Sequence, residues 1–371
     1  AREYDADSPL TNRNLAVLAL KQGQCDRALG YLLPLKKLRG EAMMYNRLAG
    51  RANRCKKVPN LKGAAANYAA AAKLARGNNL LLAEIYTEWG PLLVKSNLTD
   101  AKSKLETAVK YSVRNQSIGK AAKRNLALAL FRHGWKSMKS GKTADAYTDF
   151  ERAFRDPRLL KGTEPQAFEF SLALAQLERS EASKAEKVFK RLASKGGQNE
   201  YLKAPYDKIG AQFFAAYAKY RSGNAGLRRQ SAGEFQRLLG SAKGSFGRKV
   251  RDLLASSWEY SAYDAYRAGK TGGATNALKS AARYASSAAA KKAIAHNRAV
   301  LTMSKNPGAA ATTFAGMGGN PRESLVNLGI VLDKQGKSKE AYQAWARAKS
   351  KGVRSRNLDK WIDSKKRIFG Y

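Results

Sequence analysis

The segment ESLVNLGIVLDKQGKSKEAYQAWARAKSKG, which spans residues 323–352, decides the fold. It places a large residue before a glycine, then a second glycine, and then alanine, tryptophan and alanine at spacings i, i+4 and i+7. Residues at these last spacings share one face of an α-helix. The segment therefore predicts a helical hairpin that turns at its second glycine. The positions that carry the pattern are Leu328, Gly329, Gly336, Ala341, Trp345 and Ala348.

The same arrangement of small and large residues returns along most of the chain. Small residues let two antiparallel helices approach closely, and a large residue on the second helix fills the space between neighbouring pairs. A repeat of this kind should be sought before any other feature of a sequence. The recurring positions are Ala16, Gly23, Ala28 and Leu32; Ala52, Ala64, Tyr68 and Ala71; Gly90, Ala101, Leu105 and Ala108; Gly134, Gly141, Ala146, Phe150 and Ala153; Ala173, Ala185, Phe189 and Leu192; Ala216, Gly223, Ser231, Phe235 and Leu238; Ala262, Gly269, Ala274, Leu278 and Ala281; and Ala310, Phe314 and Met317.

The repeated hairpin resembles the tetratricopeptide repeat (TPR) family, in which a large and a small residue lie in the first helix and a small–large–small series lies in the second. The resemblance implies an all-α, right-handed α-solenoid of about nine TPR-like helix-turn-helix units, forming a single superhelix over residues 1–371. No pair can bury its apolar face alone, so neighbouring pairs must stack. The predicted units span approximately residues 10–40, 45–75, 83–112, 128–158, 168–195, 209–240, 256–286, 292–319 and 322–352, and a C-terminal capping helix spans residues 356–369.

Two details refine this prediction. The spacing between units varies from about 31 to 46 residues, against the usual 34 of the family. The extra residues are expected in loops such as 195–201 and 240–247, either as part of a binding face or as tolerated variation in length. The capping helix is expected to present an apolar stripe of Trp361, Ile362 and Phe369.

The charge of the chain is its most unusual property. It carries 69 Lys and Arg against 29 Asp and Glu, so the net charge is 69 − 29 = +40. A solubilising surface needs a net charge of only about 2–8 on a small domain. An excess of this size attracts polyanions. Forty charges match roughly 70 Å of DNA duplex, about 20 base pairs, at one phosphate charge per ~1.7 Å.

Basic residues cluster in several runs, which we expect to contact phosphates without reading sequence, because no base-reading motif is visible. The predicted polyanion-binding residues are Arg51, Arg54, Lys56, Lys57, Lys62, Lys120, Lys123, Arg124, Arg132, Lys136, Lys139, Lys142, Arg228, Arg229, Lys243, Arg248, Lys249, Arg251, Lys291, Lys292, Arg354, Arg356, Lys360, Lys365, Lys366 and Arg367.

Signatures of catalysis are missing from the sequence. His133 and His296 lie far apart, and neither has a partner at the spacing of metal ligands. No Walker-type loop, nucleophile elbow or HExxH pair occurs, and the glycine-rich stretch from Gly316 is expected to be a turn between units. We therefore expect no enzyme activity, no metal site and no cofactor.

The two cysteines and the first residue bear on the compartment. Cys25 is expected near the start of a second helix and Cys55 in the next first helix, so a disulfide between them is geometrically reasonable. The alternative is a pair of buried free thiols in a cytosolic protein. The first residue is Ala1, which favours a processed, secreted or periplasmic chain over a trimmed or cytoplasmic one. No run of 18 or more apolar residues is present, so no membrane span is expected.

Two classes of function remain after these exclusions. The first is sequence-nonspecific binding of duplex DNA or another linear polyanion, with a multi-copy coat or a head-to-tail filament as a further hypothesis. The second is a non-enzymatic envelope or secreted scaffold that binds acidic polysaccharide or a protein partner. One continuous basic stripe would favour the first, and an apolar, aromatic groove would favour the second. Single-stranded nucleic acid needs exposed aromatic residues, for which Trp135, Tyr220 and Tyr266 are the candidates.

Overall fold

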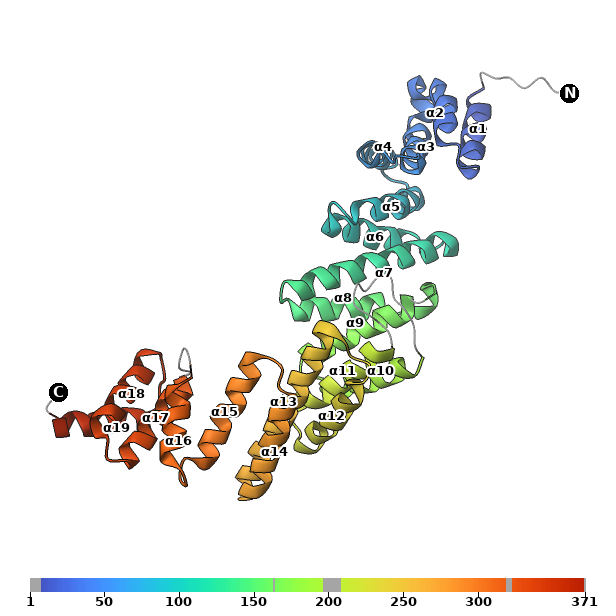
Figure 1. Ribbon diagram of the computed structural model, residues 1–371. Coiled ribbons are helices and arrows are strands. Elements are labelled where there is room, and N and C mark those ends of the chain that lie inside the picture. The colour runs from blue at the N-terminus through green and yellow to red at the C-terminus, as the bar shows by residue number, and fades with distance from the viewer. Residues whose placement is uncertain (1–7, 163, 196–207, 318–321, 370–371) are drawn as a thin grey trace. The chain divides into compact units, whose positions relative to one another are not determined.

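The computed structural model describes residues 8–162, 164–195, 208–317 and 322–369, and every regular element within these ranges is a helix. The predicted all-α repeat fold is therefore confirmed. The helices divide into two compact units, with α1 to α9 in the first and α10 to α19 in the second (Figure 1). The continuous superhelix over residues 1–371 stays a prediction.

The first unit holds four helical hairpins in sequence order, followed by a single helix. Neighbouring elements along the chain pack on one another, as expected of repeats that contact only their neighbours. The helices are α1 (Pro9–Lys21), α2 (Cys25–Leu32), α3 (Ala42–Cys55), α4 (Leu61–Leu74), α5 (Asn79–Leu93), α6 (Leu98–Tyr111), α7 (Gln116–Lys139), α8 (Thr143–Ala153) and α9 (Glu164–Glu178), with short 3₁₀ turns η1 (Pro34–Lys37), η2 (Arg39–Glu41) and η3 (Pro157–Leu159).

The second unit begins with one helix and continues with four hairpins and a last helix. Its helices are α10 (Ala182–Lys195), α11 (Lys208–Arg221), α12 (Ala225–Leu238), α13 (Gly244–Arg267), α14 (Thr271–Tyr284), α15 (Ala288–Thr302), α16 (Pro307–Ala315), α17 (Arg322–Lys334), α18 (Ser338–Ser350) and α19 (Arg356–Phe369). The fifth expected helix pair, predicted over residues 168–195, would combine α9 of the first unit with α10 of the second, and this pairing stays a prediction.

The core of each hairpin follows the pattern of small and large residues. A Cβ atom added at Gly329 would lie 2.2 Å from Nε1 of Trp345, and one added at Gly134 would lie 2.7 Å from the ring of Phe150. Both aromatic rings are buried. The glycines therefore permit the close approach of the two helices, and the ring opposite each glycine fills the interface.

Two first helices are longer than predicted, and this corrects the expected position of the extra residues. Helices α7 and α13 each contain 24 residues, whereas the other first helices contain 13 to 15. Gly244–Gly247, expected in a loop, form the first turn of α13. The side chain of Asn115 accepts a hydrogen bond from the backbone of Ile118 at 3.1 Å, so it caps an early start of α7. The expected loop 195–201 begins at the last residue of α10 and otherwise lies outside the described residues.

The capping helix α19 covers the end of the last hairpin. Ile362 and Leu358 are buried, and Trp361 lies 5.3 Å from Trp345 in a stacked arrangement. The apolar stripe therefore includes the expected Trp361 and Ile362 together with Leu358, while the side chain of Phe369 lies outside the described residues.

Candidate polyanion interface

The 26 predicted polyanion-binding residues all reach the surface, since none of them is buried. Twelve lie in the first unit and 14 in the second. Three are held in ion pairs: Lys56 lies 2.8 Å from Asp26, Arg124 lies 2.8 Å from Glu164, and Lys365 lies 2.5 Å from Asp333. These three side chains join neighbouring elements and contribute less to an external anion than exposed cations do.

One hollow in the first unit brings several cations together over an apolar floor. It has a volume of about 480 Å³ and lies between α7, the end of α8 and the turn η3. Lys123 was predicted from the sequence, whereas Arg152, Arg155 and Arg158 were not. The floor is formed by Val109, Leu126, Ala127, Leu130, Ala153 and Leu159. We call this hollow the basic pocket.

The cations of the basic pocket divide into paired and unpaired groups. Arg152 lies 2.7 Å from Glu106, and Arg158 lies 3.0 Å from Asp156. The hydrogen bond from Arg158 lowers the pKa of the exposed Asp156 carboxyl, so this acid stays ionised and offsets one of the cations. Lys123 and Arg155 are exposed and make no ion pair among the described residues, although the charge of Lys123 contributes to the lowered pKa of Asp156. They are the two cations of the pocket that no ion pair holds in the described part of the chain.

The predicted run at the end of α3 lies on a face that the first helices of the first unit share. Arg47 pairs with Glu84 and, at 2.7 Å, with Glu88, both on α5. Burial would lower the pKa of Arg47, but these two carboxylates outweigh it and raise the pKa. Arg51 and Arg54 follow Arg47 at i+4 and i+7, so they lie on the same face of α3.

The long helix α7 extends this face. The side-chain amide of Asn125 donates to the backbone oxygen of Thr87 on α5 at 3.0 Å. Arg132 and Lys139 follow Asn125 at i+7 and i+14 and are exposed. Trp135 is half-buried, and its ring packs edge-on against Phe150 at 5.7 Å. It therefore serves the packing of the hairpin, and the face it borders is mainly basic.

The corresponding face of the second unit has a different character. The hydroxyl of Tyr220 on α11 lies 3.0 Å from that of Ser256 on α13, and its ring lies 5.6 Å from that of Tyr260. Tyr260, Tyr263 and Tyr266 are 40%, 56% and 51% exposed, respectively. Of the three aromatic residues singled out from the sequence, Tyr266 is the one that is mostly exposed. The tyrosines therefore form an accessible aromatic row on α13, which we call the tyrosine face.

The remaining predicted cations of the second unit lie on several elements. The guanidinium of Arg228 stands 4.4 Å from the ring centre of Tyr260, and the Lys249 ammonium lies 5.7 Å from that of Phe213. The others lie at or near the ends of α12, α13, α15 and α19. Apart from Arg228, which borders the tyrosine face, their grouping into one surface stays a prediction.

The histidines make packing contacts. Nδ1 of His133 pairs with the buried carboxylate of Asp149, which also lies 3.0 Å from Nζ of Lys102. Nδ1 of His296 lies 2.8 Å from the hydroxyl of Ser324. Among the described residues, no group of three His, Cys, Asp or Glu side chains could hold a metal ion. The same part of the chain contains no helix that is both long and apolar enough to span a membrane.

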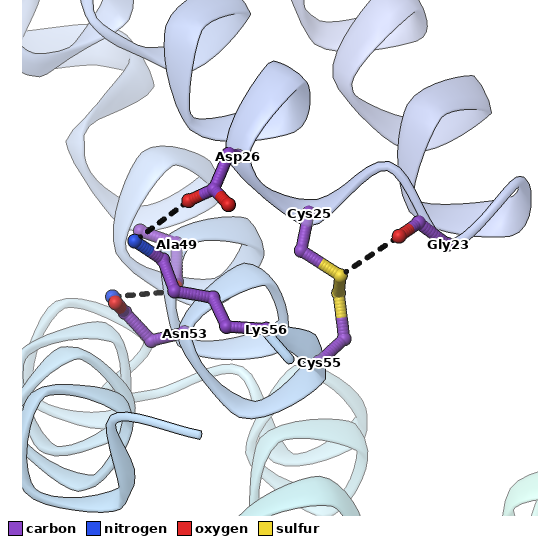
Figure 2. The surroundings of a disulfide bond; sticks show 7 residues. All are labelled: Gly23, Cys25, Asp26, Ala49, Asn53, Cys55 and Lys56. Carbon is purple, nitrogen blue, oxygen red and sulfur yellow. Dashed lines mark hydrogen bonds and ion pairs between the residues drawn. A yellow bond between two sulfur atoms is a disulfide. The ribbon is translucent and has the colours of Figure 1, made fainter. Parts of the chain in front are cut away.

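The two cysteines are joined in the structure. Cys25 begins α2 and Cys55 ends α3, with 5.8 Å between their Cα atoms (Figure 2). The ion pair between Asp26 and Lys56 connects the residues that follow each cysteine. The bond closes a loop of 30 residues and links the first two hairpins.

The chain is similar to solved structures of TPR proteins, at low sequence identity and low TM-score. No family model matches the chain, and no curated protein matches its sequence. The solved TPR domain of P58(IPK) is 14% identical, with a TM-score of 0.35 and coverage of 97% of each chain. A TPR protein from Parabacteroides merdae is 15% identical, with a TM-score of 0.36 and coverage of 88% of this chain and 99% of that one. The C-terminal part of a TPR protein from Cytophaga hutchinsonii is 14% identical, with a TM-score of 0.39 and coverage of 75% and 97%.

These three solved structures are all TPR proteins. At such identities and TM-scores they indicate no ligand or partner for this chain. The fold itself rests on the helical hairpins described above.

Proposed function

We propose that this chain is a non-enzymatic binding protein that holds a linear polyanion, with double-stranded DNA as the leading candidate, on the basic surface of its helical repeats. The basic pocket supports this most directly, because the unpaired Lys123 and Arg155 flank a hollow that also contains Arg152 and Arg158. A surface that serves only solubility does not require cations to be grouped around one hollow. The net charge of +40 adds long-range attraction for any polyanion.

Binding of this kind would depend on phosphate contacts and hence on salt. Each neutralised phosphate releases condensed counterions, so the affinity falls steeply as salt rises. Phosphate contacts fix position and carry no sequence information, so little dependence on DNA sequence is expected. The charge of one chain matches about 20 base pairs, so a longer duplex would hold several copies. The proposal therefore includes a multi-copy coat or filament.

A second candidate function is a scaffold that binds a protein partner or an acidic polysaccharide. The tyrosine face supports it, since exposed tyrosines are typical of surfaces that bind other proteins. The bond between Cys25 and Cys55 supports a secreted or periplasmic location for either function, because disulfides persist in oxidising compartments.

The decisive experiment is a titration of fluorescent duplex DNA by anisotropy from 50 to 500 mM salt, with heparin and alginate as competitors. Micromolar or tighter affinity at 150 mM salt, with a steep double-logarithmic slope and equal binding of unrelated sequences, is the expected result. Loss of binding by 150 mM salt, or a clear preference for either glycan, would refute the DNA proposal and favour the scaffold.

A further inference from the structure

A small pocket on the tyrosine face combines one carboxylate with two exposed aromatic rings. It lies between α13 and α15 and has a volume of about 220 Å³. Drug-sized ligands occupy pockets of about 300–1,000 Å³, so this one fits a single small planar group. The residues that matter most are Glu259, Tyr263, Tyr266 and Asn297, above an apolar floor that includes Leu278 and Leu301.

Glu259 is an unusual acid in so basic a chain. Its Oε1 accepts a hydrogen bond from the side-chain amide of Asn297 at 2.9 Å, and no cation pairs with it among the described residues. Burial raises the pKa of Glu259, and the bond from Asn297 only partly opposes that shift. A carboxylate can accept about four hydrogen bonds, and Asn297 supplies one of them, so the others are available to a ligand in the pocket. Such a group needs a ligand that donates hydrogen bonds.

The two tyrosines supply flat surfaces beside this acceptor. Tyr263 and Tyr266 follow Glu259 at i+4 and i+7, so all three share one face of α13. Both rings are more than half exposed. Aromatic rings of this kind stack with the bases of unpaired nucleic acid strands. The guanidinium of Arg267 lies 5.9 Å from the ring centre of Tyr263, where it could meet a neighbouring phosphate.

We infer that this pocket binds an unpaired guanine base of a nucleic acid strand. The N1–H and 2-amino groups of guanine form an adjacent pair of donors on its Watson–Crick edge, which matches the two oxygens of the Glu259 carboxylate. Adenine and cytosine place a ring-nitrogen acceptor next to their amino group, and that acceptor would face the carboxylate unfavourably. The inference rests on the proposed function, because it assumes a nucleic acid ligand, and it adds a base preference within single-stranded regions.

A lysine or arginine side chain from a peptide would also satisfy a carboxylate between aromatic rings. Two observations disfavour it. The chain has a net charge of +40, which repels a basic peptide. Two arginines also lie near these rings, with Arg267 5.9 Å from the ring centre of Tyr263 and Arg228 4.4 Å from that of the neighbouring Tyr260, and both repel a further cation. The same cations favour a ligand that combines a planar base with phosphates.

The test compares 15-nucleotide DNA strands of thymidine that carry one central guanine, inosine, adenine or cytosine. Binding to the full chain is measured by anisotropy at 150 mM salt, alongside a 20-base-pair duplex. The strand with guanine should bind about 10-fold more tightly than that with adenine, as expected for a good bidentate contact. Inosine keeps N1–H and lacks the 2-amino group, so it should fall between them.

Variants connect the preference to the pocket. Glu259→Gln should bring the guanine and adenine strands within about 2-fold of each other without weakening the affinity for the duplex. Asp264→Asn removes the same charge from the same helix outside the pocket and should keep the preference. Tyr263→Ala should weaken both strands and largely retain their ratio.

The outcomes separate this inference from the proposed function. If strands and duplex bind without base preference, or if Glu259→Gln keeps the full preference, the guanine pocket is refuted and polyanion binding stands. If a short lysine-containing peptide displaces the guanine strand from the wild type and not from the Glu259→Gln variant, the pocket belongs to a basic peptide. If neither duplex nor strand binds at 150 mM salt, both proposals fail.

Discussion

Replacing the two unpaired cations of the basic pocket should weaken DNA binding by an amount that counterion release predicts. The variant is Lys123→Ala combined with Arg155→Ala. Arg152 and Arg158 are left in place because each already pairs with an acid in or beside the pocket. Both replaced side chains are exposed, so the fold should tolerate their loss.

The magnitude follows from one phosphate contact per unpaired cation. Each contact contributes about 0.9 to the slope of log K against log salt, so the slope should decrease by about 1.8 in magnitude. The logarithm of 0.15 is about −0.82, so at 0.15 M salt each contact raises log K by about 0.9 × 0.82, or 0.74, relative to 1 M salt. Two contacts therefore correspond to a loss of about 30-fold in affinity, or about 2 kcal/mol.

The assay is anisotropy with a 20-base-pair duplex over 50–500 mM salt. The control variant, Lys73→Ala with Arg76→Ala, also lowers the net charge from +40 to +38. Both control residues are exposed on α4 or just after it, and neither was among the predicted contacts. The control should lose less than about 3-fold and keep its slope within about 0.5 of the wild type. Equal losses in the two variants would show that the charge acts diffusely and that the pocket has no special part in binding.

Three further predictions concern the fold. Gly329→Ala should destabilise the last hairpin by about 1–3 kcal/mol, because the added Cβ would meet the buried Trp345. Gly233→Ala lies on an open face of α12 and should stabilise that helix by about 0.5–1 kcal/mol. Hydrogen exchange in α17–α18 measures the first effect, and hydrogen exchange in α12 measures the second. Burial opposes ionisation of Asp252, but hydrogen bonds from the two serines before α15 lower its pKa. Its stabilising effect should therefore be present above about pH 4 and be lost as pH falls further, and Asp252→Asn should remove this part of the acid dependence in urea denaturation. Reduction of the disulfide between α2 and α3 should cost about 3.6 kcal/mol in the chain-entropy model and speed hydrogen exchange in those helices, and unchanged exchange would contradict this.

The fold could be predicted because the helix contacts depend on residues at fixed spacings. Gly134 and Phe150, or Gly329 and Trp345, are 16 positions apart, and each pair meets in the structure. The second hairpin shows the limit of this approach. The sequence favoured Ala52 as its small position, whereas Gly50 is the residue whose Cβ would lie 3.1 Å from the ring of Tyr68. Ala52 lies 16 positions before Tyr68, as in the other two pairs, and only the packing shows that Gly50, 18 positions before Tyr68, makes the close approach to its ring.

The candidate site was less predictable, because it depends on contacts between elements. Lys123 belongs to a visible basic run, but Arg155 and Arg158 join it only because the chain after α8 turns back beside α7. The length of α7 was also missed, since the repeat pattern marks only its second half. Glu259 had no distinguishing neighbour in the sequence. Its isolation from cations became apparent only once α15 was placed against α13.

In the proposed function, the faces of the two units have different tasks. Cations such as Lys123 and Arg132 can neutralise phosphates of any sequence, and they give affinity that depends on salt. A carboxylate such as Glu259 repels phosphates, so it weakens the binding of a nucleic acid unless the ligand donates hydrogen bonds to it. An acid kept free of ion pairs on a strongly basic chain is therefore better explained by selection among ligands than by affinity for them. This reasoning requires that Glu259→Gln lower the discrimination between guanine and adenine without weakening binding to duplex DNA.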